Sequence, residues 1–450
     1  MLRYCLAAVA VALATPIAAQ TADAPDVEKM DAFAASKAEE GTFMGAVLVA
    51  EGDEVLLDKG YGMASLEWGI PNGGDVKYRI GSVTKQLTAA SILLLEEQGK
   101  LSLDAPIATY LKDTPQSWQD ITVQHLLNHT SGIASFTSLD DFGRFKMLPV
   151  TRQSVIAQFR DAELEFTPGT RYSYSNSGYF LLSAIVEDVS GQSYADFIQA
   201  NLFDPLGMSD SGLADNTAII TRHASGYTRY SDGIGRAEYS NLDIPQGAGA
   251  IYSTPRDMLK WQQGLYGGKL LSPASLSKFV TPALDGYALG IMVNTNDAGT
   301  TYHHGGNIEG FNSWVAYDPE REVSVIVLGN LNSPAPTEIG SGLLTLARGG
   351  KLVLPEERKA ASLDVATLAQ YEGNYVIAPT FAIRVFMEGD ALKAQATGQS
   401  AFDLYAQEGE QDFFFLRVVN AQLRFHRDEN GDVDSLTLYQ NGQEISGNRE

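Results

Sequence analysis

The sequence predicts a protein of the α/β (α+β) class, with an antiparallel sheet flanked by helices and a separate all-β, barrel-like domain after it. Three observations support this prediction. Strand patterns occur over residues 45–62 and return over 287–330, helical patterns fill the segment between them, and alternating apolar residues follow from about residue 368. Strands from the N- and C-terminal parts of the first domain therefore form one sheet, with a helical insertion between them.

The first twenty residues have the pattern of a secretory signal peptide. MLRYCLAAVAVALATPIAAQ has a basic start at Arg3, an apolar run and small residues near Ala18 and Ala19, so cleavage is expected after Ala19 or Gln20. The apolar run is shorter than the roughly 20 residues that a membrane span needs. We therefore expect a periplasmic or secreted protein with no transmembrane anchor after cleavage.

The first domain begins with a helix, two short strands and a second helix. Residues 26–39 are predicted to be helical, and GAVLVAEGDEVLLDKGYG over 45–62 predicts two strands around a Gly-Asp turn. The second helix is predicted to start near Ser82 and to end at Gly99, because glycine suits the residue that follows a helix. Helices and loops are expected from about residue 101 to 275.

The clearest helix start in the insertion is the run STPRDMLKW. Thr254 is its predicted cap, Pro255 suits the first helical position, and Asp257 lies in the first turn. Strands then return in YALGIMVN, NSWVAYD and EVSVIVLGN, and a helix is predicted in TEIGSGLLTLARGG. These elements complete the sheet, so residues 21–352 are assigned to the first domain.

A change of composition separates the two domains. The stretch KLVLPEERKAASLD marks this change, and residues 353–366 are assigned to a linker. Residues 367–450 alternate apolar and polar side chains between closely spaced turns. That pattern is typical of an all-β barrel or sandwich.

Composition excludes several classes of function. The 450 residues carry a formal net charge of −23, so nucleic acid and anionic membranes would repel the protein. The single cysteine, Cys5, lies inside the predicted signal peptide. A cysteine nucleophile, a disulfide and a thiolate metal site are therefore not expected in the mature protein.

One short pattern, Ser82-Val83-Thr84-Lys85, suggests nucleophilic catalysis. Residues three apart on a helix share a face, so Ser82 and Lys85 can touch. The start of a helix favours an oxyanion, and a lysine removed from water has a lowered pKa and can accept the proton of a serine. In isolation, the pattern is more often a helix-capping serine followed by a solvated lysine.

Two further motifs follow in order: Tyr-Ser-Asn at 174–176 and His-Gly-Gly at 304–306. With the motif at 82–85, they resemble the serine β-lactamase/D-Ala-D-Ala-peptidase superfamily, and most of all its branch of class C β-lactamases, D-aminopeptidases, D-Ala-D-Ala carboxypeptidases and family VIII esterases. The resemblance covers about residues 31–349. It implies the penicillin-recognising serine hydrolase fold, and further landmarks are HLLNHTSGI, FTPGTRYSYSNSGY, LFDPLGMSDSG, GAGAIYSTPRDML and GGNIEGFNSW.

The resemblance also implies roles for the motif residues. Ser82 is the nucleophile that forms an acyl-enzyme, and Lys85 shares protons with it. Tyr174 activates Ser82 or a water molecule and returns a proton to the leaving group, for which a tyrosine needs cationic neighbours such as Lys85 to lower its pKa. Asn176 would bind the substrate's amide and brace Lys85.

The third motif supplies the expected substrate-binding strand. Gly305 and Gly306 let a substrate lie close against it, and the backbone N–H groups of Asn307 and Ser82 form the oxyanion hole. His304 stands where class A and class C β-lactamases have lysine. Histidine titrates near pH 6.5 and can be neutral, so its hold on a substrate carboxylate is weaker and β-lactam hydrolysis is expected to be inefficient.

Several other residues invite a functional interpretation. Glu309 is interpreted as loop surface, with recognition of a substrate amine as the alternative. His125 and His129 have the spacing of zinc ligands, but Leu126 replaces the general-base glutamate, so buried, hydrogen-bonded histidines near the floor of the site are expected instead. DENGDVDS resembles a calcium loop with Gly431 at the wrong position, and it is interpreted as a hairpin turn. No metal and no cofactor are expected.

These observations predict a secreted serine hydrolase that cleaves an amide or ester bond of a small-molecule or peptide substrate, such as a peptide with D-amino acids or a small ester. The alternatives are a β-lactamase proper and a penicillin-binding or sensor protein without turnover. The C-terminal domain resembles domains fused to some peptidases of the superfamily. It could rim the active site, restrict substrates, build an oligomer or be an inert companion.

Overall fold

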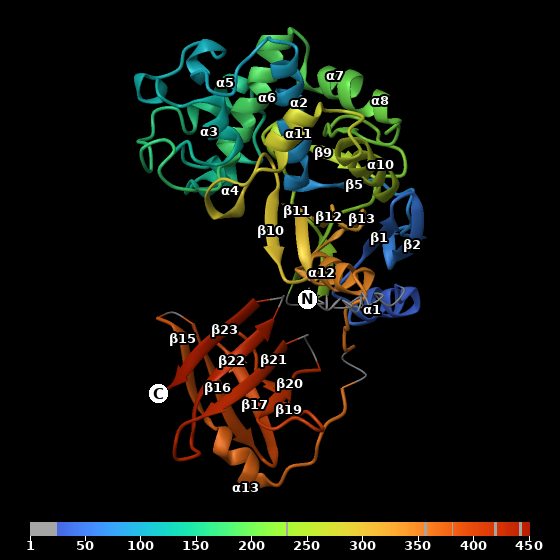
Figure 1. The fold of residues 1–450 in the computed structure, drawn as a ribbon, viewed down its shortest axis with the longest axis vertical. Coiled ribbons are helices and arrows are strands. Elements are labelled where there is room, and N and C mark those ends of the chain that lie inside the picture. The colour runs from blue at the N-terminus through green and yellow to red at the C-terminus, as the bar shows by residue number, and fades with distance from the viewer. Residues whose placement is uncertain (1–24, 231–232, 355–357, 380, 418–420, 441–442) are drawn as a thin grey trace, which may run out of the picture.

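The structure is a computed structural model that describes residues 25–230, 233–354, 358–379, 381–417, 421–440 and 443–450. The predicted signal peptide over residues 1–20, with Cys5 inside it, lies outside these residues. Figure 1 shows two units, one with a sheet and helices and the other made mostly of strands. Both parts of the predicted fold class are confirmed.

A six-stranded sheet lies at the centre of the first unit, in the order β10-β11-β12-β13-β1-β2. All neighbouring strands are antiparallel, and β1 pairs with β13 from Gly45 opposite Gly329 onward. N- and C-terminal strands therefore lie side by side, as predicted. The strands are β1 (Gly45–Glu51), β2 (Glu54–Tyr61), β10 (Met292–Asn296), β11 (Gly299–Ile308), β12 (Phe311–Asp318) and β13 (Val323–Gly329).

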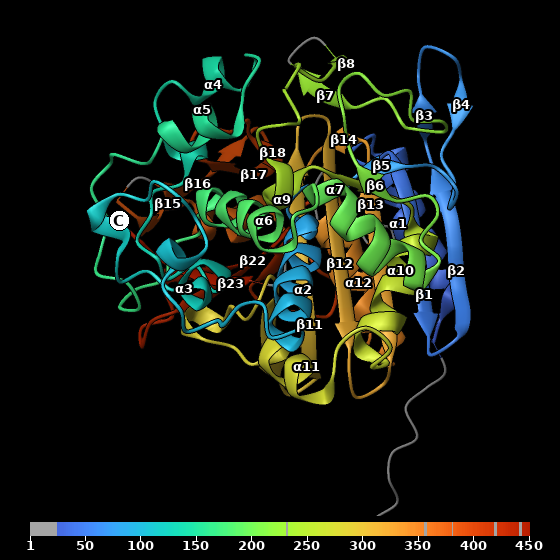
Figure 2. The same cartoon turned by 90° about the horizontal axis from the view of Figure 1, so that it is seen from above.

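Helices cover both faces of this sheet (Figure 2). Successive side chains of a strand point to opposite faces, so Ala46 and Leu48 join one buried cluster while Val47 and Val49 join another. A sheet covered on both sides explains why β1 is apolar at nearly every position. The covering helices are α2 (Thr84–Glu97) and α10 (Pro255–Tyr266) on the first side, and α1 (Val27–Glu39) and α12 (Ala335–Ala347) on the second.

The ends of three helices follow local signals in the sequence. The side chain of Asp26 accepts a hydrogen bond from the backbone N–H of Lys29 and caps α1 (2.9 Å). Thr254 caps α10 in the same way by accepting from the backbone N–H of Asp257 (3.1 Å). After α2, Gly99 has φ +68°, the left-handed conformation that ends helices. The predictions for Thr254 and Gly99 are confirmed, whereas the cap at Asp26 was not predicted.

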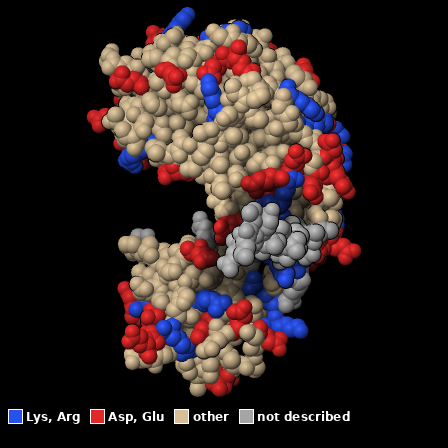
Figure 3. Space-filling view, viewed as in Figure 1, with Lys and Arg blue, Asp and Glu red and all other residues tan. Residues whose placement is uncertain are grey.

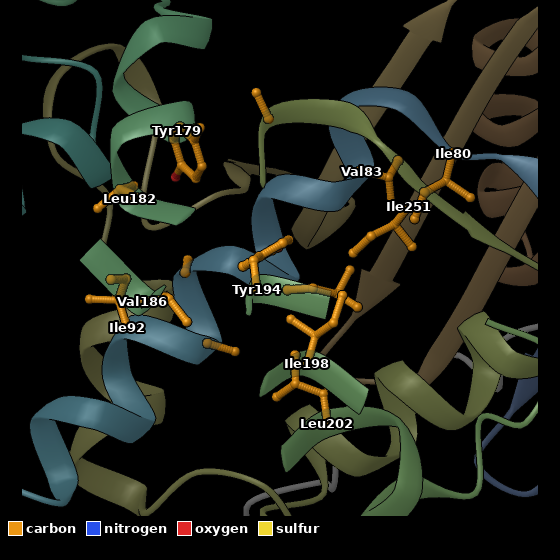
Figure 4. Close-up of a cluster of buried hydrophobic side chains, with 14 of the residues drawn as sticks. Ile80, Val83, Ile92, Tyr179, Leu182, Val186, Tyr194, Ile198, Leu202 and Ile251 are labelled. Carbon is orange, nitrogen blue, oxygen red and sulfur yellow. The ribbon is translucent and has the colours of Figure 1, made fainter. Parts of the chain in front are cut away.

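Helix α2 is buried among the helices of the insertion, which include α6 (Asn176–Ser190) and α7 (Tyr194–Ile198). Figure 4 shows Ile92 of α2 facing Val186 of α6, with Tyr194 of α7 between the helices and the turn that carries Val83. These side chains are fully buried. Because a close-packed interior transmits small shifts, this packing holds the start of α2 in a fixed position.

The rest of the first unit contains short helices and three small sheets. These sheets have the orders β5-β9-β6, β14-β7-β8 and β3-β4. The helices are α3 (Val123–Leu127), α4 (Phe142–Phe145), α5 (Arg152–Ala157), α8 (Asp204–Leu206), α9 (Gln246–Gly249) and α11 (Pro273–Val280). The strands are β3 (Met63–Ser65), β4 (Ile70–Pro71), β5 (Tyr78–Arg79), β6 (Gly212–Leu213), β7 (Tyr227–Tyr230), β8 (Gly233–Arg236), β9 (Ile251–Ser253) and β14 (Leu331–Asn332).

One strand begins later than predicted. The pattern YALGIMVN predicts a strand from residue 287, but β10 begins at Met292. Residues 287–291 instead form a buried turn in which Gly290 has φ +78°. A Cβ on Gly290 would lie 2.6 Å from the carbonyl oxygen of Lys85, so this turn is packed directly against α2. The apolar run therefore reflects burial and not strand pairing.

The C-terminal unit is a nine-stranded antiparallel sheet in the order β18-β17-β16-β15-β23-β22-β21-β20-β19. The outermost strands β18 and β19 are consecutive in the chain, so the sheet is nearly closed. Its core includes Tyr375, Phe414 and Phe425. The elements are α13 (Val365–Leu368), β15 (Gly373–Ala378), β16 (Phe381–Glu388), β17 (Ala391–Ala396), β18 (Phe402–Asp403), β19 (Tyr405–Ala406), β20 (Phe413–Phe415), β21 (Ala421–Arg427), β22 (Val433–Gln440) and β23 (Gln443–Arg449).

Two details bear on the sequence interpretation of this unit. The supposed calcium loop connects β21 and β22 as a turn, in which Asp428 accepts hydrogen bonds from the backbone N–H groups of Asn430 (2.8 Å) and Asp432 (2.9 Å). Its interpretation as a hairpin turn is confirmed. Ala361, a residue of the predicted linker, donates its backbone N–H to the carbonyl of Ala406 in the C-terminal unit (2.8 Å). The domain boundaries at residues 352 and 367 stay predictions.

Acidic and basic side chains are interspersed over the face in Figure 3, and a hollow separates the two units on this side.

Within the described part of the chain, no helix combines the length and the apolar character that a membrane crossing requires.

Candidate active site

Ser82 lies in a tight 3-10 turn, Gly81–Val83, that leads directly into α2. The turn is fixed from two sides. Ile80 donates its backbone N–H to the carbonyl of Ile251 (3.0 Å) and accepts a hydrogen bond from the Ser313 hydroxyl (2.8 Å). Strand β11 approaches so closely that a Cβ on Gly81 would lie 2.8 Å from the backbone nitrogen of Asn307. The backbone of Asn307 is therefore next to the serine turn.

Lys85 lies one turn further along α2, and its side chain is fully buried. Its Nζ donates hydrogen bonds to Ser82 Oγ (3.1 Å), Asn176 Oδ1 (2.8 Å) and the carbonyl of Ala248 (2.8 Å). Burial lowers the pKa of Lys85 well below its usual range, because the charged ammonium loses its hydration. Lys85 is thus not a solvated surface charge but an amine that can accept a proton.

Tyr174 stands just before Ser175, the residue that caps α6. Its ring lies against Lys85, with Nζ 4.7 Å from the ring centroid. Burial raises the pKa of Tyr174 above its usual value, while a hydrogen bond with Ser82 acts in the opposite direction. The expectation that cationic neighbours lower this pKa is not met, because the neighbouring lysine is itself buried. Tyr174 therefore keeps its proton near neutral pH.

His129 supports Tyr174 from below. Its Nδ1 accepts a hydrogen bond from the backbone N–H of Ser175 (3.1 Å), and its ring centroid is 4.3 Å from that of Tyr174 and 4.5 Å from that of Tyr287. His129 is the buried, hydrogen-bonded histidine that the sequence predicts. His125 is less buried, and its side chain completes the cap of α3. Among the described residues, no group of three or more His, Cys, Asp or Glu is placed to hold a metal ion.

His304 lies on β11 and is buried next to the tyrosines. Its Nδ1 is 2.5 Å from the carbonyl oxygen of Gly305 and therefore donates, so that Nε2 accepts from the Tyr287 hydroxyl (3.1 Å). Burial and the charge of Lys85 lower the pKa of His304 to about 3. The imidazole is neutral at ordinary pH, and both of its nitrogens already have partners. His303 lies on the opposite face, where its ring contacts Trp314.

The two glycines of the third motif differ in their surroundings. A Cβ on Gly306 would lie 2.0 Å from the carbonyl oxygen of Ile80 and 2.3 Å from Ser313 Oγ. A Cβ on Gly305 would come no closer than 3.7 Å, to the carbonyl oxygen of Ser313. Glycine is required at 306 because β11 packs against the serine turn. This steric reason differs from the substrate contact that the sequence predicts.

A cleft of about 380 Å³ opens above Ser82. Three predicted site residues, Ser82, Asn176 and Asn307, line it, whereas Lys85, Tyr174 and His304 are not in its wall. Lys85 and His304 are buried, and Tyr174 is half-buried. The amide of Asn176 also donates to Thr137 Oγ1 (3.1 Å). Glu309, which the sequence analysis considers, also lines the cleft. The remaining lining includes residues that the sequence does not identify, among them Phe136, Thr137, Phe142, Lys146, Tyr230, Glu238, Ser240 and Ile244.

Glu309 is part of an ion-pair cluster in the wall of the cleft. Its Oε1 is 3.0 Å from Nζ of Lys146, which also contacts Oε2 of Glu238 at 3.1 Å. The interpretation of Glu309 as loop surface is therefore wrong. No local sequence pattern reveals this cluster, because Lys146, Glu238 and Glu309 come from three distant segments.

Comparisons with known proteins agree with this geometry. Residues 30–347 match the β-lactamase family, and residues 357–449 match a domain of unknown function, DUF3471. Penicillin-binding protein 4* of Bacillus subtilis (strain 168) is 28% identical over 437 residues, which cover 90% of this chain and 95% of that protein.

Two solved structures are similar as well. The octameric penicillin-binding protein homologue from Pyrococcus abyssi has a TM-score of 0.68 and 26% identity, and the match covers 94% of this chain and 100% of that one. The D-amino acid amidase from Ochrobactrum anthropi SV3, complexed with D-phenylalanine, has a TM-score of 0.63 and 25% identity over 72% of this chain and 98% of the amidase.

Proposed function

Because the chain belongs to the β-lactamase family of serine hydrolases, we propose that it cleaves an amide or ester bond of a peptide with D-amino acids, or of a small ester, through an acyl-enzyme on Ser82. The observation that carries this proposal is the hydrogen bond between Ser82 Oγ and Lys85 Nζ, 3.1 Å long. It joins a nucleophile at the mouth of a cleft to a buried amine of lowered pKa.

In the proposed acylation, neutral Lys85 accepts the proton of Ser82 Oγ while Oγ forms a bond to the carbonyl carbon of the substrate. The bond to the leaving nitrogen or oxygen then breaks, and Tyr174 supplies the proton that the leaving group needs. Tyr174 suits a donor because it is protonated near neutral pH, and its ring lies 4.7 Å from Lys85 Nζ. The proton on Lys85 then passes to the tyrosine and restores it. In deacylation, Lys85 accepts a proton from water while the water oxygen forms a bond to the acyl carbon. The bond to Ser82 Oγ then breaks, and Tyr174 returns a proton to Oγ.

Two backbone N–H groups, those of Ser82 and Asn307, would stabilise the negative oxygen of the tetrahedral intermediate. The close approach of β11 to the turn at Gly81 supports this assignment. Asn176 lines the cleft, where its amide group can contact the substrate, while its Oδ1 accepts from Lys85 (2.8 Å) and keeps the amine in place. Removal of one oxyanion donor typically costs about 2.7–4 kcal/mol of transition-state stabilisation.

The proposed substrate class rests on two supports. The similar D-amino acid amidase is a protein named for hydrolysis of D-amino acid amides. In addition, neutral His304, bound to Tyr287 and Gly305, supplies no cation for the carboxylate of a β-lactam. We therefore expect amides and esters to be better substrates than β-lactams, with β-lactamase activity as the weaker alternative.

Location and assembly belong to the same proposal. The pattern of residues 1–20 supports export to the periplasm or beyond the cell. One similar protein is octameric and matches nearly the whole chain, the C-terminal unit included. Oligomerisation through the nine-stranded unit is therefore the assembly that we propose.

A labelled fluorophosphonate tests the nucleophile directly. Mass spectrometry should locate one adduct, on Ser82. The Ser82→Ala variant should lose both the adduct and the turnover of p-nitrophenyl butyrate, whereas Ser173→Ala, a serine near the second motif but not in the wall of the cleft, should keep both. Equal labelling of Ser82→Ala would show that another residue is the nucleophile.

A panel of substrates tests the class. We expect kcat/KM to be higher for D-alanyl amides than for L-alanyl amides, and higher for D-alanyl amides and short esters than for nitrocefin. Lys85→Met should lower kcat by roughly 10²- to 10⁴-fold for every substrate in the panel. Preferred turnover of nitrocefin would favour the β-lactamase alternative. Acylation of Ser82 with no turnover of any substrate would favour a sensor.

A further inference from the structure

A second cavity, of about 410 Å³, adjoins the cleft above Ser82. The two cavities share Glu238, Ser240 and Glu309 in their walls, so a molecule in the cleft can extend from one into the other. Arg79, His223 and Phe311 line the second cavity and not the first. None of these three residues belongs to the proposed catalytic group.

Arg79 has an unusual environment for a half-buried arginine. Its guanidinium carbon lies 5.5 Å from the centroid of the Phe311 ring, and its Nε is buried without a hydrogen-bond partner. The Arg79 side chain makes no hydrogen bond or salt bridge with any residue in the described ranges, whereas its backbone pairs with Tyr252 of β9. A guanidinium carries five N–H donors and stays charged. A buried donor left unpaired costs free energy and calls for an acceptor from elsewhere.

The other charged groups of this wall already have partners. Lys146 contacts both Glu238 (3.1 Å) and Glu309 (3.0 Å), and Arg236 contacts Glu67 at 2.6 Å. Glu309 does act on Arg79 electrostatically, but its nearest cation is Lys146. The guanidinium of Arg79 therefore faces the cavity without a contacting carboxylate.

His223 provides a second, independent sign of unmet hydrogen bonding in the same wall. Its Nε2 is buried and has no hydrogen-bond partner among the described residues. Two side chains with unpaired nitrogens thus line a single cavity. An apolar molecule would leave both nitrogens unpaired. An anionic oxygen would accept from the N–H of Arg79 Nε, and it would accept from His223 in the tautomer whose Nε2 carries the proton.

We propose that the Arg79 cavity is a binding subsite for an anionic group, a carboxylate or a phosphate, carried by the substrate that Ser82 attacks. This inference rests on the proposed function of Ser82. Arg79 precedes Ser82 by three residues, so their Cα atoms are at most roughly 11 Å apart. That span suits an anion separated from the reacting carbonyl by a few bonds. The planar fork of arginine matches two oxygens of either group.

The kinetic test compares two matched substrates: the p-nitrophenyl monoester of adipic acid, which carries a carboxylate, and its neutral methyl diester. The readout is the ratio of their kcat/KM values for release of p-nitrophenol. Arg79→Met, which keeps an apolar chain against Phe311, should lower this ratio roughly tenfold or more. Arg79→Lys should lower it less, because the charge remains. The control Arg236→Gln, at the same cavity but 76% exposed and paired with Glu67, should keep the wild-type ratio.

Equal loss for both substrates, or an unchanged ratio in Arg79→Met, would overturn the proposal, since the arginine would then serve the fold alone. A binding measurement separates this result from a failure of the catalytic assignment. Inorganic phosphate should raise the Tm of the inactive Ser82→Ala variant above that in chloride at matched ionic strength, and the added Arg79→Met change should abolish the rise.

The two readouts also distinguish the source of the anion. Phosphate binding that depends on Arg79, together with an unchanged kinetic ratio, would assign the cavity to a free anion and refute the substrate subsite. If Ser82 proves not to be the nucleophile, the phosphate measurement still decides whether Arg79 binds an anion. If Arg79→Met changes neither the kinetic ratio nor the phosphate-dependent Tm, both assignments of the cavity, to a substrate anion and to a free anion, are refuted.

Discussion

Gly306→Ala tests how strand β11 and the serine turn fit together. The new Cβ would lie 2.0 Å from the carbonyl oxygen of Ile80 and 2.3 Å from Ser313 Oγ. Cβ atoms essentially never lie closer than 3.0 Å to another heavy atom, so the turn and the strand must separate by about 1 Å or more. Overpacking of this kind typically costs about 1–3 kcal/mol, and loss of the bond from Ser313 to Ile80 (2.8 Å) adds about 1 kcal/mol. We expect the free energy of unfolding to fall by about 2–4 kcal/mol.

The same shift should act on catalysis. Ser82 follows Ile80 by two residues, and its Oγ is 3.1 Å from Lys85 Nζ, so a displacement of about 1 Å breaks the proposed contact. Misplacement of that size can cost about 10²-fold in rate. We expect a loss of this order in kcat/KM for p-nitrophenyl butyrate, in a variant that still unfolds cooperatively in urea.

Gly305→Ala is the matched control, because its Cβ would come no closer than 3.7 Å to another residue. It adds the same methyl group to the neighbouring position of the same strand. We expect its unfolding free energy to stay within about 1 kcal/mol of the wild-type value. Equal losses of stability and activity in the two variants would refute this steric explanation and would favour a direct role for both glycines in substrate contact.

Two further predictions concern buried charge. The folded protein holds His304 neutral, with a pKa of about 3 against 6.5 when unfolded, so stability should fall as pH drops from 6.5 towards 3, by up to about 1.4 kcal/mol per pH unit from this group. His304→Asn should flatten the stability curve over that range in urea unfolding, and an unchanged slope would contradict the assignment. Arg348→Met should cost about 3 kcal/mol of unfolding free energy, because Arg348 Nε contacts the fully buried Asp318 at 2.6 Å. The control Arg321→Met removes a 39% exposed partner of the same carboxylate and should cost less than about 1 kcal/mol, so similar losses would contradict the importance of burial.

Local signals in the sequence predict much of this fold. Caps such as Thr254 and the glycine after α2 depend on backbone geometry within a few residues, so spacing alone reveals them. The strands β12 and β13 are revealed by short apolar runs that are buried at most positions, and strands of the C-terminal unit such as β21 by alternating burial. The turn at residues 287–291 was not predicted, because a buried turn and a buried strand have the same apolar composition.

The active site also has features that the sequence predicts and features that it does not. The three motifs indicate which residues meet, and the contacts of Lys85 with Ser82 and Asn176 follow that expectation. The direction of the pKa of Tyr174 was not predictable, because it depends on how far the neighbouring amine is itself buried. The cluster around Lys146 was not predictable either, since its partners come from distant segments. Charge pairing across a cleft is a property of the packed molecule and leaves no local pattern.

The pairing of β1 with β13 also constrains how the protein can be made. While the helical insertion is being synthesised, β1 has an open edge, because its partner, which ends at Gly329, has not yet left the ribosome. Pairing between such distant segments makes folding slow and leaves an apolar strand exposed in the meantime. A chain that cannot close its sheet early stays unfolded for longer, which the proposed export across a membrane would require. We therefore expect the polypeptide to depend on a holding chaperone until its sheet can close.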